Sequence, residues 1–535
     1  MTDSTGTRPT RHFHVYDALT IFLTLATVAA AIYAPYRIDH DAAWYIHLAR
    51  LSLQDRASYL AVMEVNRLEV STYLSGIPYL VTQGTGIDIK ITFALGMLAL
   101  SVYGAWMSRH VLGRHTFHGQ NLAIVSVLPF MVTLLTLHYK LTRAYAEREH
   151  MFVVMLLPGL LLRYARWRGA QPARWLAILI GIVAALGTLI KPPFALIVLL
   201  PELYWLAIHR RVRPLFAPEV IAFAVTGILY VLHPFFVFPA DALRIYSTIW
   251  ANYGNYYLYW EPMTWGEILF STNVLIGVAA SVLGVALAYI STDETQRRLT
   301  IGLAMAIAGS VIVYTIQRRG FSYHFMPAIY FICVTMALVL VYISHRFFTT
   351  RWMQQAAIHI PVLAAATILY LDLSHFFREH QALQSMTPEL HQLLQDDTET
   401  GDEMIYMGMN FLRYTDITVS GLWHVHNYGS LDPLRYQLGR TQADTRPVPV
   451  DEIVDAELNR YFDDLAAEIN TRQPHVLLVA SGPGCNQHCD ASGHTMLGLL
   501  QQNPEIQRIL GEDYIATGTA DNHTVFQRSD VSEGS

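Results

Sequence analysis

Charged residues are scarce in this chain. Asp, Glu, Lys and Arg make up 15% of its 535 residues, whereas hydrophobic residues make up 53%. A typical soluble domain is about a quarter charged, so this balance indicates a membrane protein. The 36 Lys and Arg residues are scattered among short segments and form no basic stripe. Because a nucleic-acid surface needs such a stripe, we expect no nucleic-acid partner.

Cysteine is also rare, with three residues in the chain. Cys333 lies in an apolar run, where we expect it to be a small packed residue. Cys485 and Cys489 lie in a segment that begins Gly-Pro-Gly. We expect a local disulfide there if the segment is extracytoplasmic. A metal site is less favoured, because no second pair of ligands is visible.

Apolar runs that can cross roughly 30 Å of hydrocarbon predict about eleven transmembrane helices. The first run is too long for the apolar part of a signal peptide, so we expect it to be retained. The stretch 68–83 is short and contains Gly76 and Pro78, which favours a juxtamembrane or re-entrant helix. The predicted spans are 14–36, 88–108, 121–138, 151–166, 174–190, 193–208, 216–236, 264–290, 299–316, 325–345 and 355–373.

Basic residues give the predicted orientation, since cytoplasmic loops carry an excess of Lys and Arg. With residues 1–13 as a cytoplasmic tail, every inner loop of the transmembrane module 14–374 is short and basic. The first outer loop, 37–87, then lies on the outer side of the inner (plasma) membrane, as does everything after 374. The inner-loop arginines are Arg109, Arg114, Arg163, Arg166, Arg168, Arg174, Arg210, Arg211, Arg213, Arg297, Arg298, Arg346 and Arg351.

Residues 375–535 differ in character from the rest of the chain. An acidic segment at 395–403 comes before short apolar runs at 404–407 and 475–480, and a helical pattern covers 455–471. This alternation predicts a C-terminal extracytoplasmic α/β domain. No catalytic motif stands out in it, and the chain contains no internal repeat.

Several groups of charged and polar residues are predicted to lie on the outer side. Charge at a membrane boundary is costly and often functional. A carboxylate can accept the proton of an attacking hydroxyl, and Arg, Lys and His can bind a phosphate. The groups are Asp39-His40-Asp41, Glu64-Val65-Asn66-Arg67, Glu147-Arg148-Glu149-His150, Lys191-Pro192-Pro193 and the stretch from Gln317 to His324.

These groups also have a purely structural interpretation. Asp39 or Asp41 would cap a helix that starts near Ala42, since Asp is a favoured N-cap. His324 would be a packed interfacial histidine. The glutamates would form ordinary ion pairs, Glu64 with Arg67 and Glu147 or Glu149 with Arg143 or Arg148. The recurrence of such groups on one predicted side favours the functional interpretation.

The order of these groups resembles that of GT-C glycosyltransferases, polytopic enzymes that use polyprenyl-phosphate-linked sugars. In that superfamily an acid follows the first span, and Asp41 has that place here. Arg148-Glu149-His150 and the stretch from Gln317 to His324 match two further motifs, with Arg319 in place of a lysine. Similar bacterial enzymes often carry an acid-x-Asn-Pro-Pro motif. Here Glu64-Val65-Asn66-Arg67-Leu68 has its place, with Arg67 and Leu68 instead of the two prolines. The resemblance covers about residues 14–374.

The resemblance implies a GT-C fold with a C-terminal outer domain. It also implies an inverting hexosyl- or pentosyltransferase, with a polyprenyl-phosphate sugar donor and a hydroxyl acceptor on the outer face. Glycolipid, polysaccharide and protein acceptors all stay open. Inversion requires one base, which by position is Asp41, with Asp39 second and Glu64 and Glu149 as further catalytic residues. The donor phosphate would be bound by Arg148, His150, Lys191, Arg319, Tyr323 and His324.

Metal dependence differs among GT-C enzymes. A donor with one phosphate and nearby cations requires no metal, which is the interpretation we favour. If Mg²⁺ or Mn²⁺ bound, Asp39 and Asp41 would supply oxygen ligands.

Two other classes of function remain. One is a transporter or lipid flippase for a glycolipid or another anionic substrate, which usually has ionisable residues at mid-membrane and repeated halves. The predicted spans hold almost no charge and show no duplication, which disfavours this class. The other is a membrane scaffold whose working part follows residue 374.

Overall fold

The chain folds as two units, each assembled from separate stretches of sequence. Unit 1 comprises residues 1–37, 69–237 and 263–379, and unit 2 comprises 38–68, 238–262 and 380–535. The computed structural model describes residues 15–33, 40–54, 70–116, 147–251, 263–350 except 292, 388–396, 402–407, 424–427, 450–481 and 495–532 except 521, with short pieces between 126 and 133 and between 352 and 360.

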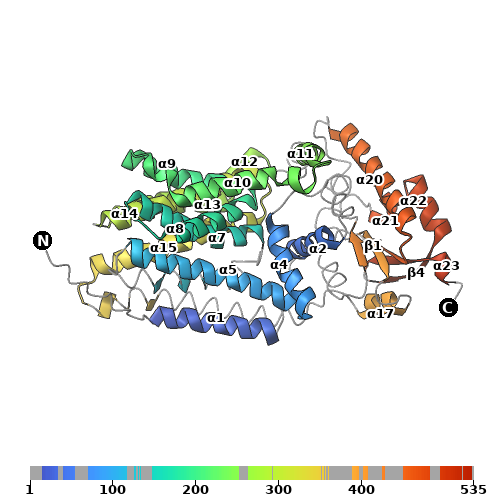
Figure 1. The fold of residues 1–535 in the computed structure, drawn as a ribbon, viewed down its shortest axis with the longest axis horizontal. Coiled ribbons are helices and arrows are strands. Elements are labelled where there is room, and N and C mark those ends of the chain that lie inside the picture. Colours follow the sequence, from blue (N-terminus) through green and yellow to red (C-terminus); the bar gives the residue numbers. More distant parts are fainter. Residues whose placement is uncertain are drawn as a thin grey trace. The chain divides into compact units, whose positions relative to one another are not determined.

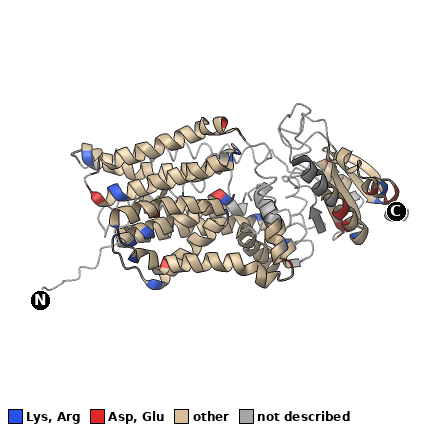
Figure 2. Cartoon of the chain, turned by 90° about the horizontal axis from the view of Figure 1, so that it is seen from above, with Lys and Arg blue, Asp and Glu red and all other residues tan. Residues whose placement is uncertain are grey.

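Unit 1 is built from apolar helices (Figure 1). They are α1 Val15–Tyr33, α4 Val70–Thr85, α5 Ile89–Val111, α7 Arg148–Trp167, α8 Arg174–Leu189, α9 Ala195–His209, α10 Pro218–Val237, α12 Trp265–Leu269, α13 Thr272–Ala288, α14 Glu294–Gln317 and α15 Met326–Phe347, with short helical turns η1 Leu112–Thr116, η2 Pro192–Phe194, η3 Arg213–Phe216 and η5 Ser322–Phe325. Figure 2 shows the charged residues mainly towards the helix ends.

The apolar helices and the fold indicate a membrane protein. Among the described residues, five helical segments are long and apolar enough to cross a membrane, and three shorter apolar helices accompany them. The predicted span 264–290 is divided, because Ser271 caps α13 after α12 has ended. The stretch 68–83 is largely helical, as α4. The total of about eleven spans stays a prediction, as does their orientation.

Helix α7 lies at the centre of unit 1, and every residue from Glu149 to Trp167 is buried. Two glycines allow its neighbours to approach closely. A Cβ atom on Gly104 of α5 would lie 2.9 Å from the Val154 side chain, and one on Gly187 of α8 would lie 2.9 Å from Met155. Small residues at such crossings bring helix backbones together in membranes. Cys333 packs against the same core, as expected.

Unit 2 contains a five-stranded sheet in the order β2-β1-β3-β5-β4. Strands β2, β1 and β3 are parallel, whereas β5 is antiparallel to both β3 and β4. The strands predicted at 404–407 and 475–480 and the helix at 455–471 are confirmed. The elements are α2 His40–Gln54, α11 Ala242–Ala251, α17 Pro388–Asp396, β1 Glu403–Met407, β2 His424–Asn427, α20 Val450–Arg472, β3 Val476–Ala480, α21 Met496–Leu500, α22 Pro504–Arg508, η7 Ile509–Asp513, β4 Tyr514–Ala520, β5 His523–Arg528 and α23 Ser529–Ser532.

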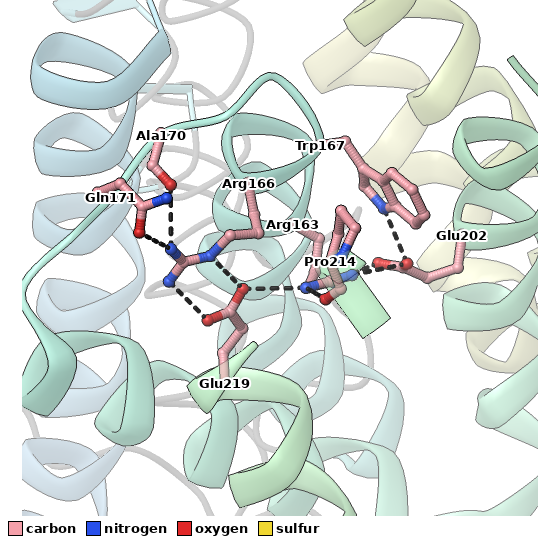
Figure 3. Close-up of polar contacts among 8 residues, drawn as sticks. All are labelled: Arg163, Arg166, Trp167, Ala170, Gln171, Glu202, Pro214 and Glu219. Atoms are coloured by element: carbon pink, nitrogen blue, oxygen red, sulfur yellow. Dashed lines mark hydrogen bonds and ion pairs between the residues drawn. The ribbon is translucent and has the colours of Figure 1, made fainter. Parts of the chain in front are cut away.

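Buried ion pairs join the last turns of α7 to α9 and α10 (Figure 3). Arg163 donates to Glu202 at 2.6 and 3.0 Å and to Glu219 at 2.9 Å, and Arg166 binds both oxygens of Glu219 at 3.0 Å. Both arginines, predicted in an inner loop, lie inside α7. Both glutamates fall within predicted spans, where almost no charge was expected. Their bidentate pairing compensates the cost of burial.

We expect Glu219→Gln to lower the free energy of unfolding by about 3–5 kcal/mol, because two buried arginines lose a shared anion. Thermal unfolding in detergent measures this change. Glu294→Gln is the matched control, since Glu294 pairs with Arg298 on an exposed helix surface, and its effect should stay within about 0.5 kcal/mol. Equal destabilisation by the two variants would contradict a structural role for the Glu219 pairs.

Candidate active site

The candidate site lies at the first turn of α7, where a carboxylate is buried. Glu149 and His150 both have 0% of their surface exposed. Glu147 precedes the helix in extended backbone, and the apolar run that follows His150 keeps the whole helix inside the unit. An anion in a first turn is favoured by the positive end of the helix dipole. The fold therefore tolerates a buried carboxylate at this position.

Lys191 reaches the site because α8 ends just before two prolines. Pro192 and Pro193 begin η2, and a residue that precedes proline is forced towards extended backbone. Lys191 has φ −146° and ψ 103°, and its residue is 2% exposed. Its Nζ lies 5.8 Å from the centre of the Phe194 ring, which stacks on Phe152. An ammonium beside such an apolar wall requires an anionic partner.

Glu149 is that partner. Lys191 Nζ donates to Glu149 Oε1 at 2.7 Å, and His324 Nε2 lies 3.8 Å from the same oxygen. The second oxygen, Oε2, is buried and accepts no hydrogen bond from any described residue. Buried polar atoms normally have a partner, so this oxygen is suited to accept a hydrogen bond from a hydroxyl or a water.

A tight turn after α14 presents the remaining predicted phosphate-binding residues. Arg318 has φ 53° and Gly320 has φ 68°. Met263 fixes this turn: its N–H donates to the Arg318 carbonyl, and its own carbonyl accepts from Arg318 Nε, both at 2.8 Å. Arg319 is consequently held in the turn, with 7% of its surface exposed. The Tyr323 ring then packs against His324 at 4.5 Å between centroids.

Burial lowers the pKa of His150, which lies just before the predicted span 151–166, from 6.5 to about 3. This imidazole is therefore neutral at physiological pH and can form hydrogen bonds without adding positive charge. Because its folded-state pKa is depressed, the unfolded chain binds a proton first, and stability falls as the pH drops below 6.5.

The structure brings together three of the residues that the sequence singled out, Glu149, Lys191 and His324. Glu149 pairs with Lys191 and not with Arg148, so the structural alternative is wrong for Glu149. Arg148 begins α7 and is half-buried.

The first-loop acids belong to the other unit. Asp41 lies inside α2, which begins at His40, and not before the helix as a cap. Its side chain lies outside the described residues, as do Asp39, Glu64, Cys485 and Cys489. Among the described side chains, no three His, Cys, Asp or Glu residues are grouped as for a metal ion. The roles of the acids and metal dependence stay predictions.

Comparisons with known proteins give no matching family model and no significant match among curated proteins. The fold is similar to that in a crystal structure of ArnT from Cupriavidus metallidurans bound to undecaprenyl phosphate. The TM-score is 0.56 and the sequence identity 11%, over 96% of this chain and 98% of that chain. At this identity the likeness concerns the fold. The chain therefore shares the fold of that structure over nearly its whole length.

Proposed function

We propose that this protein is an inverting glycosyltransferase of the inner membrane. It moves a sugar from a polyprenyl-phosphate donor to a hydroxyl acceptor on the outer face. The observation that carries this proposal is the buried Lys191–Glu149 pair with His324 beside it. Glu149 and His324 lie in two of the motifs that resemble those of GT-C enzymes. The likeness to ArnT, whose structure was solved with undecaprenyl phosphate, supports a polyprenyl-linked donor.

Each site residue makes a different contribution to binding of the donor phosphate. Lys191 supplies a compact charge, and Arg319 supplies a planar fork that matches phosphate oxygens. His150, Tyr323 and His324 supply hydrogen bonds, and Arg148 supplies a further cation at the start of α7. Glu149 holds Lys191 through Oε1 and offers Oε2 to a sugar or acceptor hydroxyl.

The reaction is one displacement at the anomeric carbon. The acceptor oxygen forms a bond to that carbon while the bond from carbon to the phosphate oxygen breaks. The electron pair of the broken bond leaves with the polyprenyl phosphate, whose added charge the cations stabilise. The acceptor proton moves to the Asp41 carboxylate, which acts as general base. Asp39 and Glu64 assist Asp41 from the same loop.

We expect Asp41→Asn to lower sugar transfer by about 10²-fold or more, since general-base catalysis contributes that much. Mass spectrometry of cell-surface glycolipids, polysaccharides and proteins measures the product in cells that carry each variant. Asp88→Asn is the control, because Asp88 caps α5 through its side chain and Asn caps as well as Asp does. Near-normal transfer by a folded, inserted Asp41→Asn protein would rule out Asp41 as the base.

We expect Lys191→Gln to weaken binding of undecaprenyl phosphate by about tenfold or more, because a charged hydrogen-bond donor is lost. The lipid-induced rise in unfolding temperature measures binding. The double variant Lys191→Gln/Glu149→Gln removes the unpaired buried carboxylate, so it should recover stability without recovering binding. Lys90→Gln, at the start of α5, is the control. Full lipid stabilisation of the double variant would count against a phosphate-binding Lys191.

We also propose that transfer requires no divalent metal, because Lys191, Arg148 and Arg319 supply the charge that a metal would supply. Transfer in membranes treated with EDTA should proceed at the untreated rate. A loss that Mg²⁺ or Mn²⁺ restores would instead assign metal binding to Asp39 and Asp41.

A further inference from the structure

The sheet of unit 2 buries both of its faces. Strand β3 alternates between them, as successive strand residues must. Leu477 and Val479 pack into one core with residues of α20, α21 and α22. Val476 and Leu478 pack into a second core on the opposite face. Figure 1 shows β1 between α2 on one side and α20 and α21 on the other.

The second core is completed by helices from distant parts of the sequence. Helix α2 contributes Tyr45, Leu48 and Leu51, which recur every three residues and form one stripe. Helix α11 contributes Ile245, next to Phe238. All five side chains are at least 96% buried in this core. Helix α17 and strands β1, β3 and β5 supply the rest, including Met404, Tyr406 and Val525.

Helix α2 depends on this contact for its structure. It has 15 residues, and isolated helices of about 12–15 residues are marginal in water. Its apolar stripe of Tyr45, Leu48 and Leu51 is buried in the core that the sheet shares, so this packing holds the helix in place. Asp41 lies four residues before Tyr45, about one helical turn away. A shift of the helix on the sheet would therefore shift Asp41.

We propose that the sheet face with Val476 and Leu478 is a mount for α2. By holding α2 it positions the general base, Asp41. Leu478 and Tyr406 act as positioning residues through α2, and Leu48 is their counterpart on the helix. The Tyr406 hydroxyl lies 3.3 Å from His523 Nε2 within this buried face, which fixes the ring in the core that the helix shares. The inference rests on the proposed function, because it assigns the mount a role through Asp41.

Two neighbouring leucines provide a matched test. Leu477 and Leu478 are both fully buried, but they face opposite cores. Leu478→Ala should lower sugar transfer per folded protein by about 10²-fold, the effect expected of a misplacement of about 1 Å. It should leave binding of undecaprenyl phosphate unchanged and increase hydrogen exchange in residues 40–54. Leu477→Ala should lose similar thermal stability while keeping transfer and protection of α2.

Leu48→Ala provides a second test that leaves the sheet sequence intact. It should reproduce the loss of transfer with undecaprenyl phosphate still bound. Near-normal transfer in this variant would overturn the proposal, as would equal losses in Leu477→Ala and Leu478→Ala. A fully active Asp41→Asn protein would overturn the base assignment instead. Hydrogen exchange in α2 of the Leu478→Ala protein decides whether the sheet holds the helix. This result does not depend on the activity of Asp41→Asn.

Discussion

A charge inside an apolar unit must have a partner, and the rest of the candidate site depends on this constraint. Lys191 and Glu149 are each at least 98% buried, and either charge alone would cost several kcal/mol. The pair forms because Pro192 and Pro193 end α8 and turn the lysine towards the start of α7. His324 then meets the carboxylate from a turn that Met263 fixes. Backbone breaks at two helix ends therefore set the geometry of one charged cluster.

The same constraint has a different solution at the other end of α7. There Arg163 and Arg166 share Glu219, and Arg163 also binds Glu202. These contacts join three helices and satisfy both carboxylates. At the first turn, Glu149 keeps one buried oxygen that accepts nothing from the described residues. Because α7 is buried along its length, its last turns act as a structural anchor while its first turn is suited to a ligand.

The sequence predicted the apolar helices and the motifs that meet at the site, because both are local patterns. The ion-pair partners of the charged residues were harder to predict. Arg148 is the cation beside Glu149 in sequence, but the actual partner lies 42 residues further on. The distribution of positive charge predicted Arg163 in an inner loop. It could not predict that the fold brings Glu202 and Glu219 beside this arginine inside the helical unit. The apolar run of β3 predicted a strand, but not which helices cover its two faces.

The C-terminal domain carries no catalytic motif, yet one apolar face of its sheet is covered by its own helix α17 only together with segments from earlier in the sequence. Helices α2 and α11 complete that core from parts of the chain far earlier in sequence. Without them, the domain would expose an apolar face of the kind that marks an interaction site or an aggregation hazard. Without the sheet, α2 would be a marginal helix. Each element needs the other to fold, so the loop that carries Asp41 and the C-terminal domain form one structural unit. In the proposal above, the domain therefore acts through the helix that it holds.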